Sequence, residues 1–409
     1  MRRLLTISYC FPPVASPEAY VSAKLMGALQ NFQIDTISAN TDLFRNREDR
    51  SLDDYVSTRF HRIIRLTAPW LLRKVMLSPR LPLRPDRYVL LTRLALRQAL
   101  ALGPAGYDAL LTRSQYHSSH LVGLALKERH PDLPWIASFS DPWTSGIYDR
   151  HVPFLTAYSA RRERAVLEKA DALIFPTTEM RDFFVSLHQD LNIAGRATVI
   201  PHGFDPSLYG QQAPTPPDSV IRIRIFGSFY GPRSPEPLLQ AVNLLIEKAE
   251  RPDFVVEIYG QNSPVLTDAI ARHSGLAGIV RHMGELDHVS ALHAMAKADI
   301  LTMVDAPMPP PSIFMPSKLA DYIGANRPIF AVTPEGAAAD IVRRIGGSVA
   351  PPDDSAQIAE TLGRLIQGVR NNRQSPVVEQ AARGDFDVRM LAYRLESTIN
   401  SAIAACRPA

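Results

Sequence analysis

The sequence predicts an α/β protein built from two parallel-sheet domains, and three observations carry this prediction. Short apolar runs alternate with longer helical patterns along almost the whole chain, which is typical of parallel sheets covered by helices. The alternation stops at a polar, proline-rich segment, residues 206–219, and then starts again. The length of 409 residues is too great for one ordinary core. We therefore expect two Rossmann-like domains facing a central cleft, with ligands outside the carboxyl ends of the strands.

The apolar runs give the expected strands in chain order. In the first domain, residues 1–205, they are Leu4–Tyr9, Ile34–Ala39, Ala109–Arg113, Trp135–Phe139, Ala172–Phe175 and Thr198–Pro201. In the second domain, residues 220–385, they are Ile221–Phe226, Val255–Tyr259, Ile279–Met283, Ile300–Val304, Ile329–Val332 and Ser348–Ala350. Residues 206–219 form the linker between these domains. Residues 386–409 contain an amphipathic helix, which either crosses back to the first domain or simply ends the chain.

The composition indicates a globular protein of a reducing compartment. Hydrophobic residues make up 46% of the chain and charged residues 21%, so both a core and a polar surface are supplied. Cys10 and Cys406 are the two cysteines, too few for a disulfide framework, and no cluster of Cys and His suggests a metal. The first apolar run is too short for a signal peptide and favours a buried strand, and no stretch is long enough to span a bilayer. We expect a cytoplasmic protein without metal or cofactor.

Residues 59–97 interrupt the alternation and carry ten basic residues against one acid, Asp86. Apolar residues are interleaved with the basic ones, as in a basic amphipathic insertion. Two interpretations stay open, because periodicity does not separate a lipid-facing stripe from a core-facing one. The segment either lies on an anionic membrane surface, at the inner face of the cell membrane, or packs on the domain with solvated arginines.

Polar residues follow three expected strands of the first domain, where sites of α/β proteins lie. Ser16 and Glu18 stand in the turn that leads from the first strand into a helix, although a GxGxxG fingerprint is missing there. His117 follows the third strand and either contacts a sugar hydroxyl or merely starts a helix. Asp141 and Trp143 follow the fourth strand. Asp141 either faces the site or caps a helix, and Trp143 stacks on a sugar or packs in the core.

The second domain offers residues suited to a nucleotide diphosphate. Gly227 ends its first strand and lets backbone approach a ligand closely, and Arg233 presents a fork of donors suited to phosphate unless it is a plain surface residue. Ser317 and Lys318 start a helix after a proline-stiffened loop, so their amides and the ammonium would meet an anion. Asp321 lies three residues further on the same helix face, where a carboxylate accepts the two hydroxyls of a ribose.

These motifs resemble the retaining GT-B glycosyltransferases, the glycogen-synthase-like class often called family 4. The likeness covers nearly the whole chain and is most specific over residues 221–333. The segments that carry it in the second half are the Gly227 loop with Arg233, Tyr259-Gly260, His282–Leu286, Ala296–Ile300 and Pro316–Ile329. In the first half, Phe11-Pro12-Pro13 and Ser140–Trp143 resemble bacterial members that act in surface polysaccharide assembly, and His202–Asp205 resembles a turn of the family.

The resemblance implies a metal-independent hexosyltransferase that keeps the anomeric configuration and uses no side-chain nucleophile. Its donor is a nucleotide diphosphate sugar, and its acceptor is a saccharide or a lipid-linked saccharide. Arg233 and Lys318 would hold the diphosphate, Asp321 the ribose, and His117 would touch the donor sugar. The other donor-binding positions implied are Gly227, Ser228, Tyr259, Gly260, Gly284, Leu286 and Ser317. Asp141 joins the catalytic group, and Ser16, Glu18 and Trp143 form the acceptor-side loop.

The sequence departs from the family pattern at three places. Ile313 stands where the first family acid is expected, Ser228 replaces a common arginine, and Ser16-Pro17 replaces a pair of glycines. Ile313 and Ser228 favour an alternative, a non-catalytic partner that keeps the fold and stabilises an active transferase. A second alternative is a sugar-nucleotide epimerase, although the acid–base cluster it needs is not evident. Nucleic acid is not an expected partner, because the basic segment holds no recognised binding module.

Overall fold

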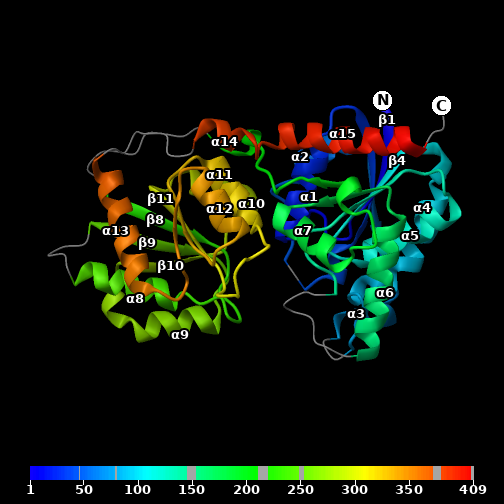
Figure 1. The fold of residues 1–409 in the computed structure, drawn as a ribbon. Helices are drawn as coiled ribbons and strands as arrows, with labels where there is room; N and C mark the ends of the chain where they lie inside the picture. The colour runs from blue at the N-terminus through cyan, green and yellow to red at the C-terminus, as the bar shows by residue number, and fades with distance from the viewer. Residues whose placement is uncertain are drawn as a thin grey trace. The chain divides into compact units, whose positions relative to one another are not determined.

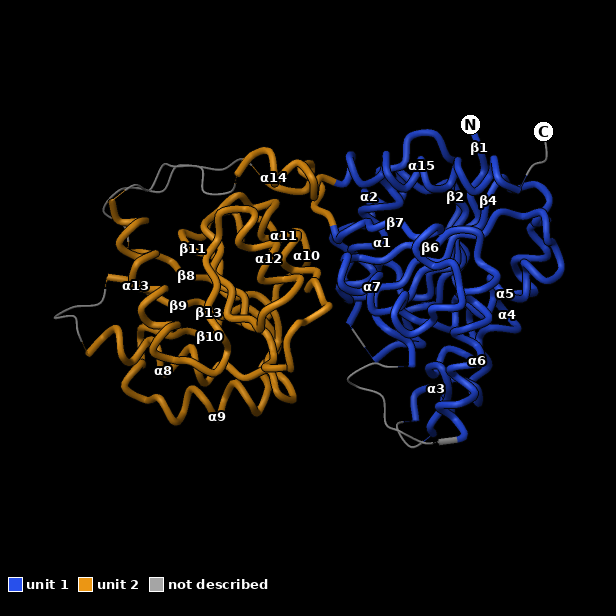
Figure 2. The backbone as a smooth tube through the Cα atoms, viewed as in Figure 1, with its two compact units in different colours: residues 1–202, 388–409 blue, residues 203–387 orange. Residues whose placement is uncertain are grey.

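The computed structural model describes residues 1–45, 47–78, 81–144, 153–210, 220–247, 253–371 and 379–406. The chain divides into two compact units, shown in Figure 2. Unit 1 comprises residues 1–202 and 388–409, and unit 2 comprises residues 203–387. The expected linker, residues 206–219, lies largely outside the described residues, since only 206–210 are described. Its first residues form a short 3-10 turn, Pro206–Leu208.

Unit 1 holds a seven-stranded parallel sheet in the order β3-β2-β1-β4-β5-β6-β7. The strands are β1 (Arg2–Ile7), β2 (Phe32–Ala39), β3 (Arg62–Leu66), β4 (Ala109–Arg113), β5 (Trp135–Ser138), β6 (Ala172–Phe175) and β7 (Ala197–Val199). The helices are α1 (Pro17–Gly27), α2 (Asp53–Arg59), α3 (Trp70–Leu77), α4 (Thr92–Ala101), α5 (Ser118–Arg129), α6 (Pro153–Lys169), α7 (Thr178–Leu187) and α15 (Val388–Cys406).

Close packing in unit 1 fixes α5 against the central strands. Trp135 of β5 is fully buried, and its indole nitrogen donates to the Thr112 hydroxyl of β4 at 2.9 Å. A Cβ atom at Gly123 of α5 would lie 2.5 Å from the Trp135 ring, so only glycine fits at this contact. The start of α5 is thereby held near the carboxyl end of β4, where the predicted site residues of this unit lie.

The helix α15 is bound to unit 1 by a carboxylate clamp. Glu396 accepts hydrogen bonds from the backbone amides of Gln30 and Asn31 at 2.7 and 3.0 Å and from the Asn31 side chain at 2.6 Å. The apolar face of α15 is buried along the length of the helix.

None of the helices in the described ranges combines the length and the apolar character that crossing a membrane requires.

The structure corrects the prediction for residues 59–97 at one place. Residues 62–66 form β3, a parallel edge strand paired with β2, where the sequence suggested only a basic insertion. Arginines concealed this strand, but charged side chains are common on edge strands, where one side of the backbone faces solvent. Arg65 donates to the Ser38 hydroxyl at 2.9 Å and to the Pro12 carbonyl, which holds the edge strand to the turn after β1.

Unit 2 holds a six-stranded parallel sheet in the order β10-β9-β8-β11-β12-β13 (Figure 1). The strands are β8 (Ile221–Phe226), β9 (Phe254–Tyr259), β10 (Val280–Gly284), β11 (Ile300–Val304), β12 (Ile329–Val332) and β13 (Ser348–Ala350). The helices are α8 (Glu236–Ile246), α9 (Pro264–Arg272), α10 (His288–Ala296), α11 (Ser317–Ala325), α12 (Ala337–Arg344), α13 (Ser355–Asn371) and α14 (Gln380–Gly384).

The sheet of unit 2 is covered on both faces, because side chains of successive strand residues point to opposite sides. Ile300 and Val304 of β11 belong to a core formed with α8, α9 and α13, whereas Leu301 and Met303 belong to a second core formed with α10, α11 and α12. All four side chains are buried. The burial of both faces explains the nearly continuous apolar run in the sequence and places α11 against the sheet.

Candidate functional site

Two cations and one carboxylate meet at the carboxyl ends of β8 and β11 in unit 2. Arg233 follows β8, Asp305 directly follows β11, and Lys318 is the second residue of α11. The Arg233 Nη2 donates to Asp305 Oδ1 at 3.2 Å. A Cβ atom at Gly227 would lie 3.1 Å from Lys318 Nζ, so the ammonium lies against the turn that ends β8. The structure thus brings together Gly227, Arg233 and Lys318, three of the residues selected from the sequence.

We call Arg233, Asp305 and Lys318 the cation site. It has an excess of positive charge and one hydrogen-bond donor without an acceptor. The pKa of Lys318 is lowered to about 8, first by burial and then by the nearby Arg233 charge, while Asp305 opposes the shift. Among the described residues, the buried Arg233 Nε finds no hydrogen-bond partner. An anion placed here would accept from that Nε and relieve the repulsion between the two cations. The helix start at Lys318 adds backbone amides with the same preference.

The position of Lys318 is fixed by a tyrosine that sequence reasoning did not select. Tyr322 follows Lys318 by one turn of α11 and is fully buried. Its hydroxyl accepts from the Phe226 amide at 2.9 Å and donates to the Thr302 carbonyl at 3.1 Å. These two bonds tie α11 to β8 and β11 at once. The start of the helix is therefore held at the strand ends that carry Arg233.

Asp305 is a second residue that sequence reasoning missed. Its carboxylate accepts from Arg233 at 3.2 Å and from the Thr333 hydroxyl at 3.1 Å, and its amide donates to the Val332 carbonyl at 2.9 Å. The sequence does contain a signal for Asp305, because this acid stands directly after the expected strand Ile300–Val304. An acid at that place follows the same rule that selected Asp141.

The remaining donor-binding candidates surround the same strand ends. The Tyr259 ring stacks on Phe226 with centroids 4.8 Å apart, and the Gly260 amide donates to the Gly284 carbonyl at 2.9 Å. A Cβ atom at Gly260 would lie 2.4 Å from the Gly227 carbonyl, so the turns after β8 and β9 touch. Ser228 accepts from the Gln261 amide at 3.3 Å. Leu286 is exposed. Ser317 starts α11, and Asp321 of the same helix is buried.

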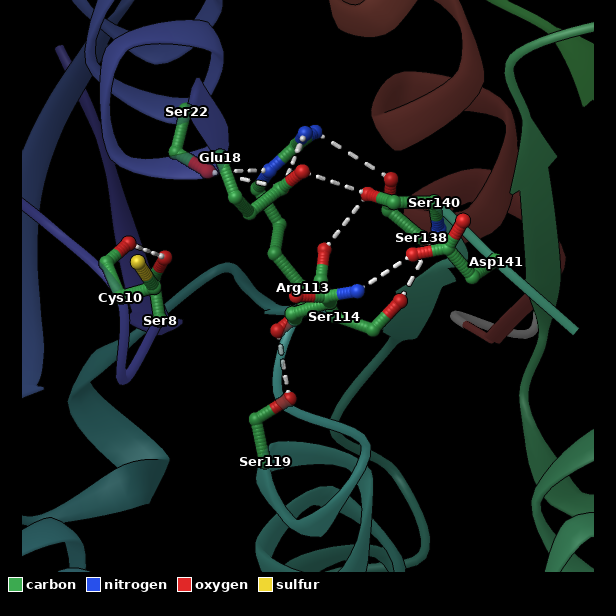
Figure 3. Close-up of polar contacts among 11 residues, drawn as sticks. Ser8, Cys10, Glu18, Ser22, Arg113, Ser114, Ser119, Ser138, Ser140 and Asp141 are labelled. Atoms are coloured by element: carbon green, nitrogen blue, oxygen red, sulfur yellow. Dashed lines mark hydrogen bonds and ion pairs between the residues drawn. The ribbon is translucent and has the colours of Figure 1, made fainter. Parts of the chain in front are cut away.

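A second cluster lies in unit 1, and Figure 3 shows it. We call it the carboxyl cluster and define it as Glu18, Arg113, Ser140 and Asp141. Glu18 is near the start of α1, Arg113 ends β4, and Ser140 and Asp141 follow β5. Arg113 Nη2 donates to Glu18 Oε1 at 3.1 Å, and Ser140 Oγ lies 2.8 Å from Glu18 Oε2. The structure therefore joins two acids chosen from the sequence through residues that were not chosen.

All three side-chain nitrogens of Arg113 donate hydrogen bonds within the protein. Its side chain is 4% exposed, Nε donates to the Ser22 hydroxyl at 2.9 Å, and Nη1 donates to the Ser138 hydroxyl at 3.2 Å. Sequence reasoning placed Arg113 at the end of a strand without assigning it a role. A buried guanidinium requires acceptors and a counter-charge, and Glu18 supplies the counter-charge.

His117 and Trp143 pack on each other in unit 1. Their rings are stacked with centroids 5.4 Å apart and an interplanar angle of 10°. Burial lowers the pKa of His117 to about 4, so the imidazole is neutral at pH 7. Trp143 is only 5% exposed, which favours the packing alternative over an open stacking surface for a sugar. Within the described part of the chain, His117 Nδ1 and Trp143 Nε1 have no hydrogen-bond partner.

Ser16, the remaining candidate of unit 1, stands at the N-cap of α1 without a side-chain capping bond.

Family models match each unit of the chain. The model described as Glycosyltransferase Family 4 matches residues 40–208, and the model described as Glycosyl transferases group 1 matches residues 221–368. The chain has the two domains of a GT-B glycosyltransferase. No curated protein matches this GT-B chain in sequence.

Within the described ranges, no three His, Cys, Asp or Glu side chains are grouped so that they would hold a metal ion.

Solved structures share the GT-B fold over nearly the full length. Sucrose-phosphate synthase from Thermosynechococcus elongatus has 16% identity and a TM-score of 0.68, with coverage of 99% of this chain and 100% of that chain. Anabaena HepE in complex with UDP and glucose has 15% identity and a TM-score of 0.66, with coverage of 98% and 100%. A putative UDP-N-acetylglucosamine 2-epimerase from Listeria monocytogenes has 12% identity and a TM-score of 0.61, with coverage of 98% and 96%. At such low identities, the structural similarity shows the fold alone, with its two Rossmann-like domains.

Proposed function

We propose that this GT-B protein is a retaining, metal-independent hexosyltransferase of surface polysaccharide or glycoconjugate synthesis. It would transfer a sugar from a nucleotide diphosphate donor to a saccharide or lipid-linked saccharide. The observation that carries the proposal is the cation site of unit 2, where Arg233 and Lys318 flank a single carboxylate. The UDP complex of HepE supports a donor of this class.

The chemistry of transfer makes use of this cation site. The bond between the anomeric carbon and the diphosphate oxygen breaks, and the acceptor oxygen bonds to that carbon on the same face. The acceptor proton passes to the departing diphosphate. Arg233 and Lys318 offset the charge that builds on the diphosphate, and fixed charges of this kind give the largest rate effects in enzymes. Asp321 binds the ribose in this proposal, and unit 1 supplies the acceptor groups, including Asp141.

The test is nucleotide release from a panel of UDP and GDP sugars with pooled saccharide and lipid-linked acceptors, measured by mass spectrometry. We expect release that depends on an acceptor, and a loss on the order of 100-fold for Lys318→Ala. The matched control is Lys297→Ala, because Lys297 is exposed at the end of α10 in the same unit. Equal activity of the Lys318 and Lys297 variants would remove the diphosphate assignment.

Two other functions stay distinguishable in the same assay. A non-catalytic partner, suggested by Ile313 and Ser228, would bind UDP or GDP without releasing nucleotide from any donor. A sugar-nucleotide epimerase would change the donor sugar without an acceptor. Incubation with the donor alone, followed by chromatography of the sugar, separates the epimerase from the transferase.

A peripheral membrane position is favoured by one helix of unit 1. On α3, Trp70 is 65% and Leu71 is 60% exposed, next to Arg73 and Lys74. The Lys74 ammonium lies 4.6 Å from the centroid of the Trp70 ring, so aromatic and basic groups form one surface. Such a surface suits the boundary between anionic headgroups and acyl chains. We propose that α3 contacts the inner face of the membrane.

Co-sedimentation with vesicles tests this contact at low salt. We expect binding to vesicles with anionic lipid and none to neutral vesicles. Lys74→Ala should bind more weakly, since each basic residue near the surface contributes about 1 kcal/mol. Trp70→Ala should also bind more weakly, because it removes the aromatic group from the same surface. The control is Arg97→Ala, an exposed residue of α4 within the same basic segment. If Arg97→Ala weakens binding as much as Lys74→Ala does, the contact is not made by α3.

A further inference from the structure

The carboxyl cluster of unit 1 contains two acids and one guanidinium, all at the carboxyl ends of neighbouring strands (Figure 3). We propose that Glu18 and Asp141 together retain one proton at neutral pH, that Glu18 holds it, and that the ionised Asp141 is the group presented to the acceptor hydroxyl. The statement about the acceptor rests on the proposed function. The statement about the proton does not.

Hydrogen counting at Ser140 gives the first argument. Its hydroxyl oxygen lies 2.7 Å from the Ser114 carbonyl and 2.8 Å from Glu18 Oε2. A serine hydroxyl carries one hydrogen, and a carbonyl oxygen only accepts. If Glu18 were ionised, Ser140 would face two acceptors with a single hydrogen. A protonated Glu18 donates to Ser140, which in turn donates to Ser114, and both short contacts are satisfied.

The two oxygens of Glu18 have different surroundings, as a carboxylic acid requires. Arg113 Nη2 lies 3.1 Å and the Ser22 hydroxyl 3.2 Å from Oε1, and both donate to it. Oε1 thus has the environment of a carbonyl oxygen, whereas Oε2 faces the Ser140 hydroxyl. The proton therefore belongs on Oε2.

Charge balance gives the second argument. Glu18 is 8% and Arg113 is 3% exposed, so an uncompensated charge here is costly. With both acids ionised, the cluster would carry one net negative charge, and one retained proton makes it neutral. Burial raises the pKa of Glu18 to about 7, with Asp141 adding to the shift and Arg113 and Ser140 opposing it. In the turn after β1, the neighbouring thiol of Cys10 is itself held neutral by burial, since its pKa is raised to about 12.

The hydrogen bonds also decide which acid ionises. Burial raises the pKa of Asp141 as well, but the Gln115 amide donates to Asp141 Oδ2 at 2.5 Å and favours its ionised form. Asp141 is partly exposed, whereas Glu18 is buried. Two carboxyl groups with such different environments take different protonation states. Asp141 is then left as a carboxylate that accepts from a saccharide hydroxyl.

Infrared spectroscopy of the whole protein tests the proton directly. We expect the carbonyl stretch of a protonated carboxyl group at pH 6, its loss as the pH rises through about 7, and its absence in Glu18→Gln. The amide of this variant still donates to Ser140, so the fold is kept. The control is Glu128→Gln, because Glu128 is exposed on α5. A band of equal intensity in the wild type and in Glu18→Gln at pH 6, or no band in the wild type, overturns the proposal.

Acceptor kinetics test the role of Asp141. In the wild type we expect the acceptor KM to rise several-fold between pH 6 and 8.5, because a second negative charge at Glu18 repels Asp141 and breaks the bond to Ser140. This rise should be absent in Glu18→Gln, while UDP affinity stays that of the wild type. Asp141→Asn should raise the acceptor KM at every pH. A pH-dependent KM in Glu18→Gln would remove the link between the proton and the acceptor. If no donor is turned over, the acceptor role falls with the proposed function, and the infrared result still decides the proton.

Discussion

The cation site of unit 2 and the carboxyl cluster of unit 1 are electrostatic opposites in the same structural position. Both lie where parallel strands end, and both contain an Arg–carboxylate pair, buried in unit 1 and partly buried in unit 2, with one additional charged group. In unit 2 the additional group is Lys318, and in unit 1 it is Asp141. An excess cation is relieved by an anionic ligand, whereas an excess carboxyl group is relieved by retaining a proton. In our two proposals, the same arrangement at the strand ends binds a diphosphate in unit 2 and retains a proton in unit 1.

The largest effect that sharpens this contrast is on stability. The folded-state pKa of Glu18, about 7, lies above its ordinary value of 4.5, so the folded protein binds the proton more tightly than the unfolded chain. Stability is therefore lost as the pH rises from about 4.5 to 7. Glu18→Gln cannot ionise, and we expect it to be more stable than the wild type at pH 8 by up to about 3 kcal/mol, with little difference at pH 4. Urea unfolding at the two pH values measures this.

Glu128→Gln provides the baseline for that comparison, since its side chain is exposed. If Glu18→Gln is less stable than the wild type at pH 8, the folded protein stabilises the ionised form of Glu18, and the pKa of Glu18 is not raised. The carboxyl cluster would then be an ordinary ion pair, and the contrast with unit 2 would fail.

The second effect concerns the cation site. The pKa of Lys318 is about 8, so its ammonium is present at pH 7 and is lost as the pH rises above 8. We expect UDP affinity to fall above pH 8 in the wild type. Lys318→Ala should bind UDP about 10- to 100-fold more weakly at pH 7, since a charged hydrogen bond is worth about 1.5–3 kcal/mol. Isothermal titration calorimetry from pH 6.5 to 9.5 measures both.

The ionisation of UDP itself is common to both proteins, so the ratio of the two affinities isolates Lys318. That ratio should shrink above pH 8, where the wild type loses its ammonium. A constant ratio across the range would mean that Lys318 keeps its charge throughout, and its pKa would then not be lowered by burial and by Arg233.

Sequence reasoning reached only part of each cluster for a physical reason. Glu18, Asp141, Arg233 and Lys318 were selected because local patterns reveal where strands end and helices begin. Arg113 and Asp305 were not selected, because pairing is a long-range property: Glu18 and Arg113 are 95 positions apart, and Arg233 and Asp305 are 72 apart. The parallel sheets followed from the alternation of apolar runs, whereas β3 was concealed by the arginines of an edge strand. Charge balance in a site becomes visible only when distant strand ends are brought together.

Asp305 offers the smallest and most selective test of the comparison. Its carboxylate repels a diphosphate, and it also raises the pKa of Lys318. In Asp305→Asn the amide oxygen still accepts from Arg233, so we expect UDP to bind a few-fold more tightly at pH 6.5, where Lys318 is charged in both proteins. The advantage should decline toward pH 8.5, because the pKa of Lys318 is lower without the acid. Weaker binding at pH 6.5 would show instead that Asp305 acts mainly by holding Arg233 in place, and the excess charge of the site would matter less than its geometry.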